Sequence, residues 1–85
     1  MRHLASRRFW GAYEQLPNAV QRLADSNFDL LKRDPGHPSL HFKKVGKFWS
    51  ARVGLQYRAL AVPSAEGGYT WVWIGAHETY ARLLA

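Results

Sequence analysis

The stretch Phe48-Trp49-Ser50-Ala51-Arg52-Val53-Gly54-Leu55-Gln56-Tyr57-Arg58-Ala59-Leu60 decides the fold of this chain. It contains two runs of aromatic and β-branched residues separated by a short segment that begins with glycine, a pattern typical of a β-hairpin. If the turn has three residues, Gly54 to Gln56, then Val53 pairs with Tyr57 and Arg52 lies opposite Arg58. A two-residue turn would instead place Arg52 beside Tyr57. The sequence leaves both registers open.

The same pattern continues on both sides of this hairpin. Leu40–Val45 precedes it and Tyr69–Ile74 follows it, with Gly46-Lys47 and Pro63–Gly68 as the intervening turns. Together with Phe48–Val53 and Tyr57–Val62, these runs predict an antiparallel sheet of about four strands. In the last strand, simple alternation places Trp71 and Trp73 on one face and Val72 and Ile74 on the other.

The first 34 residues have helical rather than strand periodicity. Apolar residues recur at helical spacing from Ser6 to Leu16, with Ser6 as a candidate N-cap, and again from Pro17 to Leu31. Pro35 ends the second helix. His77 to Leu84 predicts a short C-terminal helix. The expected fold class is therefore α+β, with an N-terminal helical hairpin packed on the sheet.

Length and composition restrict the possible classes of protein. The chain has 85 residues, so we expect one domain, residues 1–85, without a buried cofactor cradle. The absence of cysteine excludes disulfides and thiol chemistry. His37 and His41 have helical metal spacing, but Pro38 excludes a regular helix, so we expect no metal site. No segment approaches the roughly 20 apolar residues of a membrane span, which predicts a cytoplasmic protein without membrane contact.

Positive charge is concentrated in the strand region. The net charge is +6, and no acidic residue occurs from Pro35 to Ala65. Lys43, Lys44 and Lys47 in this window either protect a sheet edge or bind a polyanion. Arg52 opposite Arg58 would repel it by up to about 1 kcal/mol unless an anion such as phosphate lies between them. In the shifted register, Arg52 would only contact Tyr57.

Two further candidates follow the last strand. His77 emerges at its end, and Tyr80 lies one helical turn later on the same face. Imidazole is well suited to proton transfer near neutral pH, and a phenol can position a phosphate oxygen. The structural alternatives are that His77 caps the final helix and that Tyr80 packs with Leu83 and Leu84.

Two stretches of the sequence together resemble the RelE/ParE toxin superfamily of toxin–antitoxin systems. They are the Trp-Ser-Ala-Arg-Val hairpin ending in Tyr57-Arg58 and the later Trp73-Ile74-Gly75-Ala76-His77-Glu78-Thr79-Tyr80. The similarity is greatest to the RelE- and YoeB-like mRNA interferases, and it extends from the Phe9-Trp10 helix to the C-terminus. Members of this family begin with a strand. Here only Met1 to Ala5 is available for it, so the sheet either lacks this strand or pairs it weakly at an edge.

The resemblance implies a metal-independent endoribonuclease without cofactors that cleaves mRNA on the ribosome. It implies that Arg58 stabilises the phosphorane, that Arg52 positions the phosphate and that His77 acts as general acid or base. Tyr80 matches the terminal tyrosine, although two residues separate it from His77 where that branch has the pair adjacent. Lys43, Lys44 and Lys47 would bind the RNA backbone.

The resemblance also implies a cognate antitoxin partner, which would cover the basic cleft or the helical hairpin. An apolar patch around Phe9, Trp10 and Tyr13 would suit such a partner, but these residues are more simply explained as core. Two alternative functions remain from other classes. One is a ParE-like inhibitor of DNA gyrase, and the other is a basic nucleic-acid-binding module without catalysis.

Overall fold

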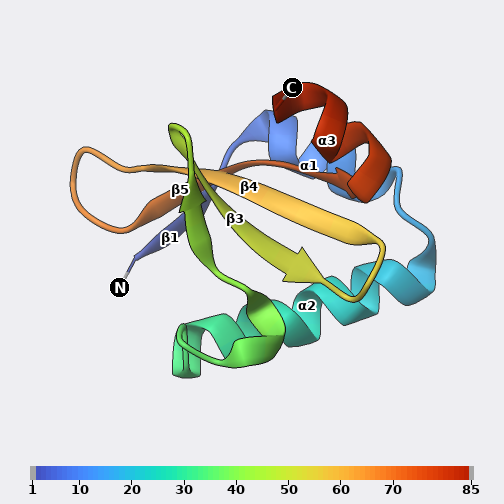
Figure 1. Cartoon of the computed structure of the whole chain (residues 1–85), viewed down its shortest axis with the longest axis horizontal. Coiled ribbons are helices and arrows are strands. Elements are labelled where there is room, and N and C mark those ends of the chain that lie inside the picture. The colour runs from blue at the N-terminus through green and yellow to red at the C-terminus, as the bar shows by residue number, and fades with distance from the viewer. Residues whose placement is uncertain (1, 85) are drawn as a thin grey trace.

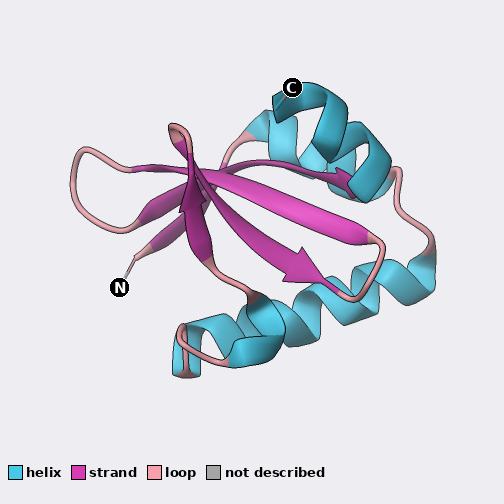
Figure 2. Cartoon of the chain, in the orientation of Figure 1, coloured by secondary structure: helices cyan, strands magenta, loops and turns pink. Residues whose placement is uncertain are grey.

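A computed structural model describes residues 2–84 and has an α+β fold, as predicted. Within these residues no helix has the length and apolar character needed to cross a membrane. Residues 2–84 form three α-helices and a five-stranded sheet, and Figures 1 and 2 show how the helices are arranged around the twisted sheet. The elements are β1 His3–Ala5, α1 Arg7–Glu14, α2 Asn18–Arg33, β2 Lys43–Val45, β3 Phe48–Val53, β4 Tyr57–Pro63, β5 Tyr69–Ala76 and α3 His77–Leu84.

The sheet has one strand more than the four expected. Its order is β1-β5-β4-β3-β2, and β1 pairs with β5 in parallel while all other pairs are antiparallel. Of the two possibilities for the N-terminal residues, pairing at the edge is therefore the one observed. The N-terminal edge strand was difficult to predict because three residues are too few to show alternation.

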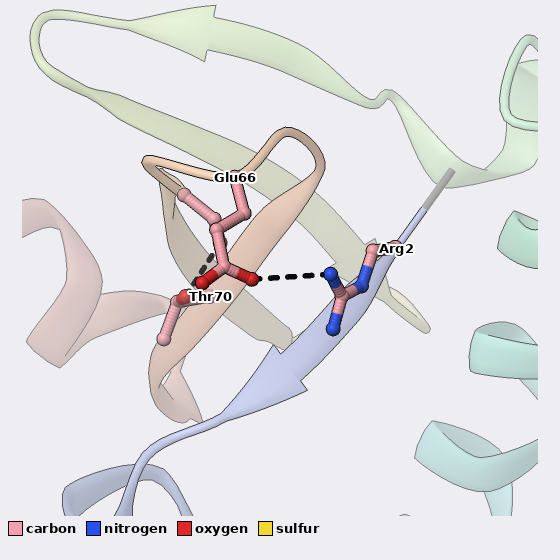
Figure 3. A network of polar contacts seen from close by, with 4 residues as sticks. Arg2, Glu66 and Thr70 are labelled. Carbon is pink, nitrogen blue, oxygen red and sulfur yellow. Dashed lines mark hydrogen bonds and ion pairs between the residues drawn. The ribbon is translucent and has the colours of Figure 1, made fainter.

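Polar contacts fix the start of β1 to the β4–β5 turn, as Figure 3 shows. The carbonyl of Arg2 accepts a hydrogen bond from the amide of Tyr69 at 2.8 Å. The Arg2 guanidinium pairs with Glu66 at 3.1 Å, and the hydroxyl of Ser64 in the turn lies 2.7 Å from that of Thr70 in β5. Because both charged side chains of the ion pair are mostly exposed, the backbone bond contributes more to this attachment than the ion pair does.

The strand predicted over Leu40–Val45 is shorter than expected. Pro38–Leu40 forms a 3₁₀ turn in which the His37 ring accepts a hydrogen bond from the amide of Ser39, and His41 has a left-handed backbone with φ 44°. Leu40 is thereby directed into the core, where it is 1% exposed. The sheet begins at Lys43 because the chain must first leave this turn.

The two N-terminal helices form where the apolar periodicity predicts them. The hydroxyl of Ser6 accepts a hydrogen bond from the amide of Phe9 at 3.1 Å, so Ser6 is the N-cap of α1. Pro17 precedes the first residue of α2, and that helix ends before Pro35. Both helices cover one face of the sheet, where the core contains Leu16, Ala24, Leu31, Leu40, Ala51, Val53, Ala59, Ala61, Trp71 and Ile74.

A β-bulge in β5 changes the expected alternation of its side chains. Trp71 pairs with Ala61 and Trp73 pairs with Leu60, so Val72 is an extra residue opposite this step of β4. Trp71 and Ile74 consequently both enter the core. The prediction that Trp71 and Trp73 share a face is therefore wrong, because it assumed an uninterrupted strand.

Candidate functional site

The two hairpin arginines lie directly opposite each other. The turn has three residues, and Val53 pairs with Tyr57 and Arg52 with Arg58. Gly54 allows this turn because its φ is +65°, and an added Cβ would also collide with the Leu23 side chain. The first of the two predicted registers is therefore confirmed.

Both arginines project from the face of the sheet that is turned away from α1 and α2, which we call the second face. Their neighbours Ala51, Val53 and Ala59 all belong to the core, and successive strand residues point to opposite sides. The second face thus carries two positive charges at one paired position, both on partly buried side chains.

The guanidinium groups lie in an environment that favours an anion. Burial lowers the pKa of Arg58 below its ordinary value, and the charge of Arg52 lowers it further, while Tyr80 acts in the opposite direction. One nitrogen of Arg58 donates to the carbonyl of Tyr57 at 3.0 Å. The Nε–H of Arg52 is buried and has no hydrogen-bond partner among residues 2–84. An anion at this position would supply an acceptor and reduce the repulsion.

Tyr80 and His77 extend the same cluster. α3 begins directly after β5, and the amide of its first residue, His77, donates to the carbonyl of Gln56 in the hairpin turn at 2.7 Å. The Arg58 guanidinium lies 5.9 Å from the centre of the Tyr80 ring, which stacks with the ring of His77 at 5.7 Å between centres. The structure therefore brings together Arg52, Arg58, Tyr80 and His77, with Tyr80 next to both Arg58 and His77.

The three candidate lysines do not share one surface. Lys43 pairs with Ser50, which alternates with the core residue Ala51, so Lys43 lies on the second face with the arginines. Lys44 pairs with Trp49, which packs against the core, and therefore points to the other side. Lys47 lies in the β2–β3 turn, 5.6 Å from the centre of the Phe48 ring. Only Lys43 extends the arginine cluster.

In the described part of the chain, no acidic side chain forms an ion pair with this cluster. Glu78 is exposed at the start of α3, and no ion pair joins it to an arginine within the described part of the chain. In residues 2–84, no three His, Cys, Asp or Glu side chains lie close enough together to hold a metal ion.

An apolar cavity of about 340 Å³ lies between α1, α2 and the core face of the sheet. Phe9, Trp10 and Tyr13 line it, so the structure combines the two interpretations of these residues. Phe9 and Tyr13 pack against the core, whereas Trp10 is 50% exposed. The hydroxyl of Tyr13 donates to Asp25 at 2.8 Å and connects the two helices across the cavity; this bond raises the pKa of Tyr13.

Trp73 was not among the predicted site residues, but its side chain lies on the second face. Regular alternation assigned it to the same side as Trp71, and only the bulge at Val72 reverses this. The signal that could have identified it is a register shift, which depends on pairing with β4 and is not encoded in the β5 pattern itself.

Comparison with known proteins gives structural matches only. No family model matches the sequence, and no curated protein matches it in a sequence search. Among solved structures, the RelB–RelE antitoxin–toxin complex from Methanococcus jannaschii matches with a TM-score of 0.72 at 12% identity, over 96% of this chain and 99% of that chain. The YoeB/ParE toxin from Agrobacterium tumefaciens matches with a TM-score of 0.68 at 18% identity, over 91% and 99%.

A third match is the toxin–antitoxin complex RelBE2 from Mycobacterium tuberculosis, with a TM-score of 0.63 at 18% identity, over 88% of this chain and 95% of that chain. Each of the three matches covers nearly the full length of this chain and of the chain it is compared with. The arrangement of helices and strands is thus that of a known group of structures. This chain has the fold of the RelE/ParE toxin superfamily.

Proposed function

We propose that this protein is the toxin of a toxin–antitoxin pair and a metal-independent endoribonuclease that cleaves mRNA on the ribosome in the cytoplasm. The observation that carries the proposal is the pairing of Arg52 with Arg58 beside Tyr80 and His77 on the second face. The fold, which is shared with solved RelE and YoeB toxins, supports it.

The proposed reaction is attack of an RNA 2′-oxygen on the adjacent phosphorus. The 2′-oxygen forms the new bond, the bond to the 5′-oxygen breaks, and the 2′-hydroxyl proton leaves as the 5′-oxygen gains one. Negative charge grows on the phosphorane oxygens, which the guanidinium groups of Arg52 and Arg58 stabilise. Imidazole can give or accept a proton near neutral pH, so His77 is the proposed acid or base.

Tyr80 has a positioning role in this proposal. Its ring lies next to both the guanidinium of Arg58 and the imidazole of His77, so it can position both groups. Lys43, on the same face, adds positive charge for a neighbouring phosphate. Lys44 and Lys47 would act only on more distant parts of the RNA backbone or ribosome.

The proposed partner is an antitoxin with acidic and apolar side chains that occupies the cavity between α1 and α2. The exposed Trp10 and Phe28 at this cavity give the apolar contact. Arg7 and Arg8 on α1 are exposed, and the net charge of +6 disfavours a second copy of this chain as the occupant.

Inducible expression in bacteria with mapping of mRNA ends tests the ribonuclease function. Wild type should arrest growth and create new ends within translated codons. Arg58→Ala and His77→Ala should reduce cleavage by about 10²-fold or more, because each removes transition-state stabilisation or proton transfer. Arg22→Ala, which removes the same charge from an exposed position on α2, is the matched control and should cleave like wild type.

Two other results would contradict the ribonuclease function. Growth arrest with intact mRNA and broken chromosomal DNA, unaffected by His77→Ala, would indicate inhibition of gyrase. RNA binding without growth arrest or cleavage would indicate a binding module.

A further inference from the structure

Trp73 occupies the second face although Trp71 and Ile74, on either side of it in β5, belong to the core. It pairs with Leu60, a residue 2% exposed that is not part of the helix-side core, whereas Trp71 and Ile74 both belong to that core. The bulge at Val72 causes this separation. One tryptophan of β5 thus stabilises the core and the other lies on the side of the arginines.

The indole of Trp73 lies over Gly75, next to Arg58. A Cβ added at Gly75 would overlap the six-membered ring of Trp73, so glycine is required for the indole to lie along the strand. Gly75 pairs with Arg58, and Arg58 pairs with Arg52. Across three adjacent strands, the second face therefore has two guanidinium groups followed by a flat aromatic ring.

This order of groups fits a nucleotide better than it fits phosphate alone. The guanidinium groups match a phosphate, and an indole that is only partly buried provides an aromatic surface beside them. Aromatic side chains next to a positive groove bind single-stranded nucleic acids by stacking on the bases, with little preference for sequence.

We infer that Trp73 stacks on a base of single-stranded RNA whose neighbouring phosphate lies at the Arg52–Arg58 pair. The inference rests on the proposed function only in taking RNA as the ligand of this face. It assigns to Trp73 a binding role and no part in proton transfer.

Two RNA analogues separate stacking from charge. Both are labelled 2′-O-methyl oligonucleotides, which lack the attacking hydroxyl, and they have equal numbers of phosphates; one has normal bases and the other is abasic at every position. Fluorescence anisotropy with purified protein measures their affinities over a series of salt concentrations. Wild type should bind the base-bearing oligonucleotide more tightly.

Variants of Trp73 differ in their ability to stack. Trp73→Leu keeps apolar cover over Leu60 but has no flat ring, so it should lose about 5- to 100-fold in affinity for the base-bearing oligonucleotide and none for the abasic one. Trp73→Phe should retain part of this preference. Arg22→Ala, at an exposed position on α2, is the control and should keep the wild-type preference for the base-bearing oligonucleotide.

The outcomes distinguish this inference from the proposed function. If Trp73→Leu binds both oligonucleotides like wild type while Arg58→Ala binds both less tightly, stacking is wrong and the phosphate site remains. If Arg58→Ala also binds like wild type, RNA is not the ligand of this face and both proposals fail. Urea unfolding of each variant, followed by circular dichroism, establishes that the protein tested is folded.

Discussion

His3 is a half-buried titratable residue on the core side of the sheet. It is far from the arginine cluster in the sequence. Its Nδ1 accepts a hydrogen bond from the indole of Trp71 at 3.0 Å, and the two rings stack with 6.1 Å between centres. Its Nε2 is buried without a hydrogen-bond partner in residues 2–84. Burial, together with nearby positive charge, lowers the pKa of His3 from its ordinary value of 6.5. The neutral ring is therefore the form that the fold stabilises.

This environment predicts a pH dependence of the free energy of unfolding. Below pH 6.5 the unfolded chain binds a proton at His3 before the folded chain does, so stability falls as the pH decreases below that value. His3→Asn keeps an acceptor for Trp71 but cannot titrate. Urea unfolding between pH 7.5 and about pH 5 should show a shallower loss in this variant. Parallel curves for the two proteins would contradict the assignment.

The first helix depends on a local bond at its N-terminus. Ser6 satisfies one of the amide groups that an α-helix leaves unpaired, and α1 has only eight residues over which to compensate for a loss. Ser6→Ala should lower the free energy of unfolding by about 1 kcal/mol.

Urea denaturation followed by circular dichroism measures this difference. Ser26→Ala is the control, because Ser26 is exposed within α2 and alanine is a good helix former there. That variant should remain within about 0.5 kcal/mol of wild type. Equal destabilisation by both substitutions would show that the cap contributes nothing.

The helices and the hairpin were predictable because their signals are local. Ser6, Pro17 and Pro35 mark the helix boundaries, and Gly54 marks the turn that sets Arg52 opposite Arg58. The sequence still left two registers for that turn, since the pattern of strand residues on either side does not set the length of the turn between them.

Features that depend on contacts between distant parts of the chain were not predictable. The bulge at Val72 requires the pairing of β5 with β4, and β1 acquires its structure only by joining β5. Lys43 and Lys44 lie on opposite faces because adjacent strand residues alternate, but which of them joins the arginines depends on the pairing of β2 with β3. The candidate site was thus predicted at its centre, Arg52, Arg58, His77 and Tyr80, but not at its margin, where Trp73 lies.

The stability of the protein rests on a small core. A chain of 85 residues buries a limited share of its apolar surface, and domains of this size lie near the lower end of the usual range of stability. Leu31 is 2% exposed in this core, between α2 and the sheet, whereas Leu55 is 82% exposed in the hairpin turn. The two leucines therefore form a matched pair.

Leu31→Ala should lower the free energy of unfolding by about 2–5 kcal/mol, because it leaves a cavity in the core. Leu55→Ala should change it by less than about 0.5 kcal/mol. Thermal unfolding measured by circular dichroism compares the two. A similar melting temperature for both variants would mean that the helix-side core is not the main source of stability.

Because β1 pairs in parallel with β5, the five-stranded sheet is completed only after β5 has been synthesised. His3–Ala5 has no strand to join until Tyr69–Trp71 has been synthesised and has left the ribosome. Contacts between such distant segments form late in folding, because a long loop must close first. His77 and Tyr80 follow these residues in the chain. A nascent chain therefore cannot assemble its arginine, tyrosine and histidine cluster on a complete sheet until both β5 and the residues that follow it have left the ribosome.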